Sequence, residues 1–202
     1  MNRIVLSTRN QGKIAELNAM LKDFGVEALG LDHFPEIPEI EENGLTFQEN
    51  ALLKAETVNQ ATGLIAVADD SGLEVDALDG APGVFSARYS GLQATDEQNN
   101  TKLLNELKNI PPDKRSARFR CVIAAVGPKR EPIIAQGTWE GVIATTPAGK
   151  NGFGYDPLFF DPDLGQTAAQ MDKSTKNSRS HRGKALRNLL LAWPEEWRGD
   201  RA

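Results

Sequence analysis

Two adjacent carboxylates, Asp69 and Asp70, follow the apolar run Leu64–Ala68 and precede Ser71 and Gly72. The apolar run is short enough to be a buried strand, and ligands of α/β proteins bind where such strands end. Because side chains alternate between the two faces of a strand, we expect the two acids to do different jobs, one facing a cleft and one supporting a turn. An ordinary Asp-rich turn is the alternative for these residues taken alone.

A polar loop rich in hydrogen-bond donors follows the apolar segment Arg3–Leu6, which predicts a first strand, and precedes apolar residues at helical spacing from Ile14 onward. Free N–H groups and the helix dipole at such a position suit an anion. The segment is not a P-loop, since Ser7 and Ile14 stand where that motif needs Gly and Ser or Thr. A plain strand-to-helix turn is the alternative. The candidate anion-binding residues are Thr8, Arg9, Asn10, Gln11, Gly12 and Lys13.

An acidic, Pro-interrupted segment at 32–44 leads into Thr46 and Glu49, which form a capping box for a helix predicted over Phe47–Thr62. A carboxylate just before that helix is well placed to reach a cleft, and Glu41 or Glu42 is the candidate. Together with Asp70 it could hold Mg²⁺, which prefers carboxylate oxygens in phosphate chemistry.

Two further segments are candidates for ligand binding. The loop 147–157 holds three glycines and two aromatic residues, and an exposed Phe153 would offer a flat surface to a nucleobase. The segment 172–184 is basic and precedes an apolar helix that runs to Trp193. Positive charge at a helix start is unusual, so we expect something anionic to compensate it. A long surface loop is the alternative for 147–157.

The remaining patterns predict an α/β fold with a mixed sheet. A second strand is expected at Val26–Leu29 and a helix after the capping box at Thr95 and Gln98. Two long strands, Arg115–Val126 and Ile133–Ile143, are expected to pair as an antiparallel hairpin. The segment 85–91 is expected to be a polar loop, and Thr167–Gln170 a short helix. No linker separates independent domains, so residues 1–202 are expected to form one domain.

Composition narrows the class of protein. The chain has 202 residues, a formal net charge of −5 and one cysteine, Cys121. An acidic protein is not a general nucleic-acid binder, and a lone cysteine in an apolar run fits a reducing compartment. No apolar stretch reaches the length of a membrane span or a signal peptide. We therefore expect a cytoplasmic protein with neither nucleic acid nor membrane as a partner.

Taken together, these residues favour hydrolysis of a nucleoside polyphosphate. Lys13 and the segment from Lys176 to Arg182 would grip phosphates, Glu41 and Asp70 would hold Mg²⁺, and Phe153 would stack on a base. A cation offsets phosphate charge while a carboxylate deprotonates water. The motifs HExxH, paired CxxC, GxSxG and the Rossmann glycine pattern are all missing from the sequence.

The chain resembles the inosine triphosphate pyrophosphatase family, and specifically its bacterial members, almost from end to end. Six blocks carry the resemblance in the family's order: STRNQGK at 7–13, EENGLTFQENALLKA at 41–55, ADDSGLEVDAL at 68–78, GAPGVFSARYSG at 80–91, GFGYDPLF at 152–159 and SHRGKAL at 180–186. The resemblance implies an elongated mixed β-sheet flanked by helices, with two lobes and a central nucleotide-binding cleft, in a protein that is usually a homodimer.

The resemblance also implies an activity: Mg²⁺-dependent cleavage of dITP, ITP or XTP to the nucleoside monophosphate and pyrophosphate, which cleanses the nucleotide pool. Asp70 would then be the general base and a metal ligand, and Glu41 the second metal ligand, with Glu42 as the alternative. The segment from Thr8 to Lys13 would bind phosphates. The other implied substrate contacts are Ser71, Phe153, Gly154, Tyr155, Asp156, Lys176, His181 and Arg182.

Three rival hypotheses remain. A related pyrophosphatase could act on methylated or pyrimidine triphosphates, although the SHRG and FGYD blocks argue against it. A nucleotide sensor without turnover is disfavoured by the intact Asp70 and Glu41. An RNA-binding module is disfavoured by net acidity and by the lack of an aromatic RNA-binding strand motif.

Overall fold

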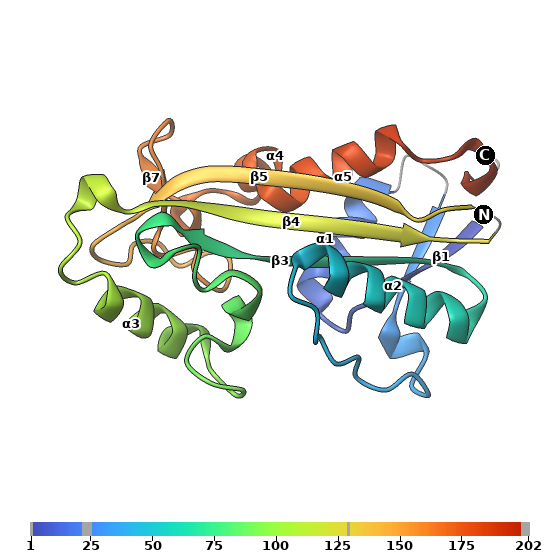
Figure 1. Cartoon of the computed structure of the whole chain (residues 1–202). Coiled ribbons are helices and arrows are strands. Elements are labelled where there is room, and N and C mark those ends of the chain that lie inside the picture. The colour runs from blue at the N-terminus through green and yellow to red at the C-terminus, as the bar shows by residue number, and fades with distance from the viewer. Residues whose placement is uncertain (1, 22–25, 129, 199–202) are drawn as a thin grey trace. The chain divides into compact units, whose positions relative to one another are not determined.

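The computed structural model describes residues 2–21, 26–128 and 130–198. The chain folds into seven strands and five α-helices over these residues, joined by loops and short 3-10 turns (Figure 1). The strands are β1 Asn2–Leu6, β2 Val26–Gly30, β3 Ile65–Val75, β4 Ser116–Val126, β5 Ile133–Ile143, β6 Phe159–Asp161 and β7 Gln166–Thr167. The helices are α1 Gln11–Leu21, α2 Phe47–Thr62, α3 Asp96–Glu106, α4 Lys173–Arg179 and α5 His181–Leu191.

The strands form one mixed sheet in the order β2-β1-β3-β4-β5-β6-β7. Strand β1 pairs in parallel with β2 and with β3, whereas β6 is antiparallel to both β5 and β7. The N–H of Ile143, at the end of β5, donates to the carbonyl of Arg115, just before β4. The two long strands therefore run antiparallel, as predicted, and the α/β class with a mixed sheet is confirmed.

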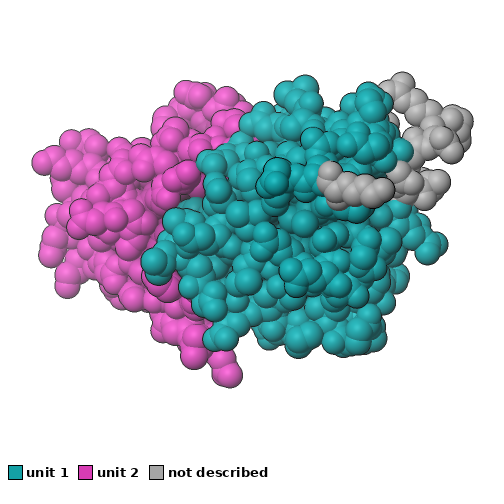
Figure 2. Space-filling model, turned by 45° about the vertical axis from the view of Figure 1, so that its right-hand side comes forward, with its two compact units in different colours: residues 1–70, 122–136, 185–202 teal, residues 71–121, 137–184 magenta. Residues whose placement is uncertain are grey.

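The chain divides into two compact units (Figure 2). Unit 1 comprises residues 1–70, 122–136 and 185–202, and unit 2 comprises residues 71–121 and 137–184. Each unit has its own apolar core: Val5, Leu31, Ile37, Val58 and Ala66 pack together in unit 1. The core of unit 2 includes Leu73, Leu103, Phe119, Trp139, Leu158, Phe159 and Met171. None of the helices among the described residues is long and apolar enough to span a membrane.

Helix α2 begins and ends where its sequence predicts. The Thr46 hydroxyl accepts a hydrogen bond from the N–H of Glu49, and the Glu49 carboxylate accepts one from the N–H of Thr46. Gly63 ends the helix with φ of 67°, a left-handed conformation that glycine adopts without strain. A well-defined helix start matters here because Asn50 and Lys54 follow within two turns.

The predicted turn at Asp69–Gly72 is wrong. Strand β3 runs without interruption from Ile65 to Val75, so both acids lie inside the strand rather than at its end. Asp69 and Asp70 are 5% and 7% exposed. The turn propensity of these residues does not decide the structure here, because both acid side chains find hydrogen-bonding partners while the chain stays extended.

Three smaller predictions also need correction. Helix α1 starts at Gln11, so the predicted donor-rich loop is shorter, and Gln11, Gly12 and Lys13 form the first helical turn. Residues 83–88 form a 3-10 helix where a polar loop was expected. The basic segment 172–184 is itself mostly helical, since it contains α4 and the start of α5.

Candidate active site

An acid cluster in unit 1 consists of Glu42, Asp69 and Asp70 with Asn50 and Lys54. Asn50 and Lys54 are four residues apart on α2, so they share one face of that helix. The Lys54 ammonium lies 2.6 Å from a Glu42 carboxylate oxygen, 3.7 Å from Oδ1 of Asp70 and 2.7 Å from the carbonyl oxygen of Asp69. One buried cation is therefore surrounded by three oxygens of the acid cluster.

Asn50 ties Asp70 to the acidic segment. Its side-chain amide donates from Nδ2 to Oδ2 of Asp70 at 3.0 Å, and its Oδ1 accepts the N–H of Gly44 at 2.8 Å. A Cβ on Gly44 would come within 2.7 Å of that same Oδ1, so only glycine permits this approach. Asn50 is completely buried. Both of its bonds fix the orientation of the Asp70 carboxylate relative to the segment that carries Glu42.

Burial raises the pKa of Asp70, and the neighbouring carboxylates of Glu42 and Asp69 raise it further. The Lys54 ammonium and the hydrogen bond from Asn50 act in the opposite direction. Burial disfavours the charged form of Lys54, but the carboxylates of Asp70, Asp69 and Glu42 outweigh burial and raise its pKa. Asp70 is thus a carboxylate with increased affinity for a proton, beside an ammonium that stays charged.

Asp69 has a different partner from Asp70. Its carboxylate accepts a charged hydrogen bond from the Lys13 ammonium, with Nζ 3.0 Å from Oδ2 and 3.2 Å from Oδ1. Lys13 belongs to the first turn of α1. The neighbouring acids in β3 therefore hold different elements, Asp69 holding α1 and Asp70 holding α2.

The segment from Thr8 to Lys13 is organised by its own side chains. Oδ1 of Asn10 accepts the N–H of Lys13 at 3.2 Å, and the Thr8 hydroxyl accepts the N–H of Asn10 at 3.1 Å. The guanidinium of Arg9 donates to the carbonyl of Ile37 at 2.6 Å, which ties this segment to the loop after β2. Residues 9–12 are exposed. The exposed side chains at this helix start are therefore accessible to an anion in solution.

An aromatic cluster in unit 2 consists of Phe153, Asp156, Lys176 and Arg182. Phe153 is 46% exposed, and the cations of Lys176 and Arg182 lie 5.0 and 5.6 Å from its ring centroid. Asp156 is 3% exposed and accepts hydrogen bonds from the Lys176 ammonium at 2.5 Å and from the N–H of Phe153 at 2.9 Å. Burial raises the pKa of Asp156, and Lys176 works against that effect.

Glycines shape the loop that presents Phe153. Gly152 has φ of 79°, and a Cβ there would overlap a carboxylate oxygen of Asp156 at 1.9 Å. The N–H of Gly154 donates to Asp96 at 2.6 Å, and its carbonyl accepts from Asn100 at 2.8 Å. Helix α3 therefore holds one side of the loop while Asp156 holds the other.

Arg182 and His181 begin helix α5, and both are at least nine-tenths buried. The Arg182 guanidinium donates to the hydroxyl of Ser71 at 3.2 Å. His181 stacks on Phe119, with ring centroids 4.7 Å apart and planes 14° apart. Ser71 follows Asp70 directly in the chain, so the first turn of α5 holds the residue after Asp70.

The side chain of Tyr155, another predicted site residue, is buried in the core of unit 2. It is 4% exposed, and its hydroxyl donates to the carbonyl of Ser86 at 2.8 Å. Burial raises the pKa of this phenol. The predicted site residues thus fall into two groups. Lys13, Asp70 and the segment from Thr8 belong to unit 1, and Ser71, Phe153, Gly154, Asp156, Lys176, His181 and Arg182 belong to unit 2.

Asn50 and Lys54 were missed by the sequence-based prediction. They stand four residues apart after the capping box, but the helix carries several other polar residues, so no pattern in the sequence singles them out. The structure also separates the two candidate glutamates. Glu42 lies against Lys54, whereas Glu41 is exposed.

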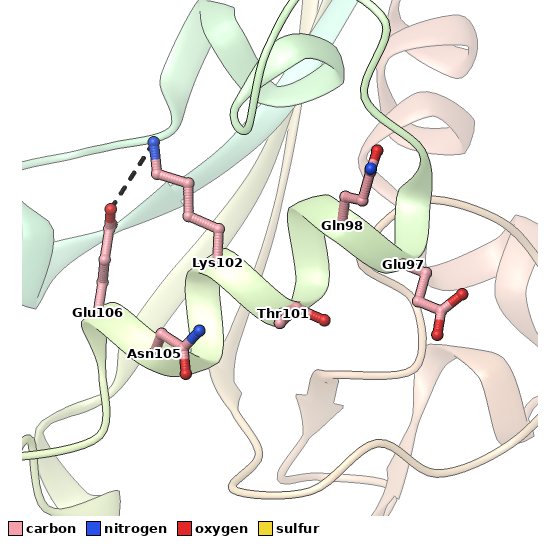
Figure 3. Close-up of a pocket in the computed structure, with 6 residues that line it drawn as sticks. All are labelled: Glu97, Gln98, Thr101, Lys102, Asn105 and Glu106. Carbon is pink, nitrogen blue, oxygen red and sulfur yellow. Dashed lines mark ion pairs between the residues drawn. The ribbon is translucent and has the colours of Figure 1, made fainter.

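A hollow of about 510 Å³ lies elsewhere in unit 2, along the exposed face of α3 (Figure 3). None of the predicted site residues lines this hollow. Lys102 and Glu106, two of the lining residues, form an ion pair across the last turn of α3. Its lining residues are all polar and come from one helix: Glu97, Gln98, Thr101, Lys102, Asn105 and Glu106.

The acid cluster offers carboxylate oxygens, which are the ligands that a hard divalent cation prefers. Among residues 2–21, 26–128 and 130–198, no three His, Cys, Asp or Glu side chains form a ready metal site. Mg²⁺ is usually held by one or two carboxylates together with substrate phosphates and water. The segment of Glu41 and Glu42 and strand β3 with Asp70 carry carboxylates of this kind, and the ammonium of Lys54 between Glu42 and Asp70 shows that these oxygens accommodate a positive charge.

Comparison with known proteins identifies similar sequences and structures. The dITP/XTP pyrophosphatase of Nitratidesulfovibrio vulgaris is 58% identical, over 97% of this chain and 98% of its own length. The dITP/XTP pyrophosphatase of Geobacter sulfurreducens is 53% identical, over 96% of this chain and 98% of its own length. A HAM1 protein from Coxiella burnetii has a similar structure, with a TM-score of 0.89, 47% identity and coverage of 95% and 98%. The Staphylococcus aureus Ham1 protein has a TM-score of 0.86 and 45% sequence identity, with coverage of 95% of this chain and 97% of its own.

A family model supplies the remaining comparison. The model described as the Ham1 family matches residues 4–192, which include every candidate residue of the acid and aromatic clusters. A match of this length, together with relatives more than half identical over nearly the whole chain, defines membership. This chain belongs to the Ham1 family.

Proposed function

We propose that this protein is a nucleoside triphosphate pyrophosphatase that hydrolyses dITP, ITP and XTP to the monophosphate and pyrophosphate. The single observation that carries the proposal is the buried Asp70 carboxylate, held by Asn50 and Lys54 beside Glu42. The relatives named dITP/XTP pyrophosphatases match over nearly the whole chain. Removing deaminated purines from the nucleotide pool would be the purpose of this reaction.

Asp70 is the proposed general base. Its raised pKa increases its affinity for the proton of an attacking water, and a base works best when its pKa approaches the working pH. The water oxygen bonds to the α-phosphorus, the bond from that phosphorus to the bridging oxygen breaks, and pyrophosphate leaves. The water proton passes to Asp70, whose orientation is fixed by Asn50.

Glu41 and Asp70 are the residues proposed to hold Mg²⁺, with Glu42, which pairs with Lys54, as the alternative to Glu41. When bound, the ion would offset the charge of the phosphates. Lys54 stabilises the ionised carboxylates of the acid cluster. Lys13 and the exposed residues after Thr8 would bind phosphate oxygens at the start of α1.

The aromatic cluster is proposed to bind the base. Phe153 offers a partly exposed ring for stacking, and Lys176 and Arg182 place hydrogen-bond donors over that ring. Donors suit the 6-oxo group of a deaminated purine and face the N6 amino group of ATP unfavourably, because buried donors without an acceptor are costly. Ser71, which accepts a hydrogen bond from Arg182, and His181, which stacks on Phe119, are proposed as further substrate contacts.

The other parts of the proposal follow from the family resemblance. We expect one functional domain over residues 1–202, a homodimer, and a cytoplasmic protein.

Product analysis tests the proposal. Purified protein with ITP and Mg²⁺ should yield IMP and pyrophosphate, with little turnover of ATP or GTP and none after chelation of the metal. Production of IDP and orthophosphate would mean that another bond is cleaved. Tight binding of ITP without turnover would contradict the proposed hydrolysis and indicate a nucleotide sensor.

A further inference from the structure

Helix α4 carries two cations that form ion pairs with buried carboxylates of unit 2. It has seven residues, none of them buried. A helix this short is marginal on its own, because helix nucleation is costly. Its N-terminus is capped by Asp172, whose carboxylate accepts the N–H of Thr175. The cap defines where the helix starts, but it does not attach α4 to the rest of unit 2.

The attachment at its C-terminal end is Arg179. Its guanidinium donates to both carboxylate oxygens of Asp161, at 3.0 to 3.2 Å, and to Asp163 at 2.7 Å. An arginine fork that holds a carboxylate through two oxygens fixes orientation as well as distance. Arg179 therefore determines both the position and the rotation of the last turn of α4.

Asp161 is a rigid anchor for that fork. It is 1% exposed and lies at the end of β6. It accepts the indole N–H of Trp139 at 2.9 Å and the N–H groups of Asp163 and Leu164 at 2.9 and 3.3 Å. These donors come from the core and the backbone, so the anchor does not depend on α4 for its own placement.

Lys176 lies one turn before Arg179 on the same face of α4. Its ammonium reaches Asp156, in the turn just before β6, at 2.5 Å, and lies over the ring of Phe153. The two cations of one helix face thus hold two buried carboxylates five residues apart. Any rotation of α4 that releases Arg179 also moves Lys176 away from the aromatic cluster.

We propose that Arg179 is a positioning residue for the base end of the substrate, which acts through Lys176 by anchoring α4 to Asp161. This inference rests on the proposed function, since Lys176 is proposed there to contact the base. Arg179 itself need not touch the nucleotide. Its effect on the reaction should therefore appear in KM for the nucleotide and vanish when Lys176 is absent.

The first test is Arg179→Met, which keeps the length of the side chain and removes the fork. We expect KM for ITP to rise about tenfold, because small displacements of positioning groups have large effects, while kcat changes much less. Arg179→Lys keeps the charge, and we expect it to restore only part of the loss. Arg118→Met is the matched control, because Arg118 also pairs with carboxylates of unit 2, those of Glu74, Asp76 and Glu140, and with none of the aromatic cluster.

The second test is a double-mutant cycle with Lys176→Met. If Arg179 acts through Lys176, the KM of the double variant should equal that of Lys176→Met alone. A full additional rise in KM would overturn the proposal, and so would an equal KM effect of Arg118→Met. If Arg179→Met does not fold, the cycle is run with Arg179→Lys, whose retained charge keeps the helix attached.

Failure of the proposed function gives a different result. Wild type would then release no pyrophosphate from ITP, or Lys176→Met would leave KM unchanged. An active wild type with a large Lys176→Met effect and no Arg179→Met effect would reject the positioning role alone.

Discussion

The acid cluster of unit 1 and the aromatic cluster of unit 2 carry opposite charge. Three carboxylates in the acid cluster, Glu42, Asp69 and Asp70, contact two ammonium groups, those of Lys13 and Lys54. In the aromatic cluster, one carboxylate stands against the cations of Lys176 and Arg182. The excess of negative charge suits a metal cation, and the excess of positive charge suits electron-rich oxygens of a ligand. The two clusters therefore suit ligand groups of opposite charge.

The supporting elements differ in the same way. Asn50, Lys54 and Asp70 stand on a long helix and inside a strand, and all are at least nine-tenths buried. Phe153 stands on a glycine-rich loop, and Lys176 on a helix that buries nothing. Chemistry needs groups fixed closely in place, whereas recognition tolerates loops. We therefore expect substitutions in unit 1 to act mainly on kcat and those in unit 2 mainly on KM.

The largest expected effect follows from Asp70→Asn. The amide keeps the size of the side chain but cannot accept the proton of water, so we expect kcat for ITP to fall about 10³-fold. KM should change only a few-fold. Asp69→Asn, which alters the neighbouring acid held by Lys13, should lower kcat far less. Steady-state kinetics with both variants checks the difference, and equal losses would contradict the assignment of the base to Asp70.

A smaller effect is expected from Phe153→Leu in unit 2. Stacking of a base on an aromatic ring contributes about 1–3 kcal/mol, so KM for ITP should rise about tenfold with kcat little changed. Phe85→Leu is a matched control, because Phe85 is also exposed and lies under an arginine, Arg88. A loss confined to kcat in Phe153→Leu would break the division of labour between the two units.

Regular elements could be predicted from the sequence because their signals are local. The capping boxes at Thr46 and Thr95 place the starts of α2 and α3, and apolar runs place β1, β4 and β5. The turn predicted at Asp69–Gly72 failed because its evidence was local propensity. The partners that keep this segment extended, Lys13 and Asn50, are distant in sequence.

The site was predicted in part for a related reason. Residue types such as Asp70 and Phe153 carry their own chemical meaning, so both could be chosen from the sequence. Asn50 could not be selected from its type, because an asparagine on a helix is usually solvated, and its two hydrogen bonds join segments six and twenty residues away. Tyr155 shows the reverse case, in which a residue inside a strong motif belongs to the core.

The smallest expected effect concerns stability and compares Asp161 with Asp70. Burial works against the charge of Asp161, yet hydrogen bonds from Trp139 and Arg179 outweigh burial and lower its pKa. Burial dominates at Asp70 and raises its pKa. A carboxylate whose pKa is lowered by folding stabilises the protein above its unfolded pKa, near 3.9, and this contribution is lost as the pH falls through the folded value. Asp161 is therefore a structural acid.

Asp161→Asn should accordingly lower the thermal midpoint by a few degrees at pH 7, and the difference from wild type should stay constant down to about pH 5. Below about pH 4 the difference should shrink, because wild type then protonates Asp161 and loses the same interaction. Asp163→Asn serves as the control, since Asp163 shares Arg179 but is largely exposed, and such pairs contribute little. Thermal scans from pH 3 to 8 check both variants. If the difference in thermal midpoint instead widened as the pH fell, folding would raise the pKa of Asp161, as it raises that of Asp70.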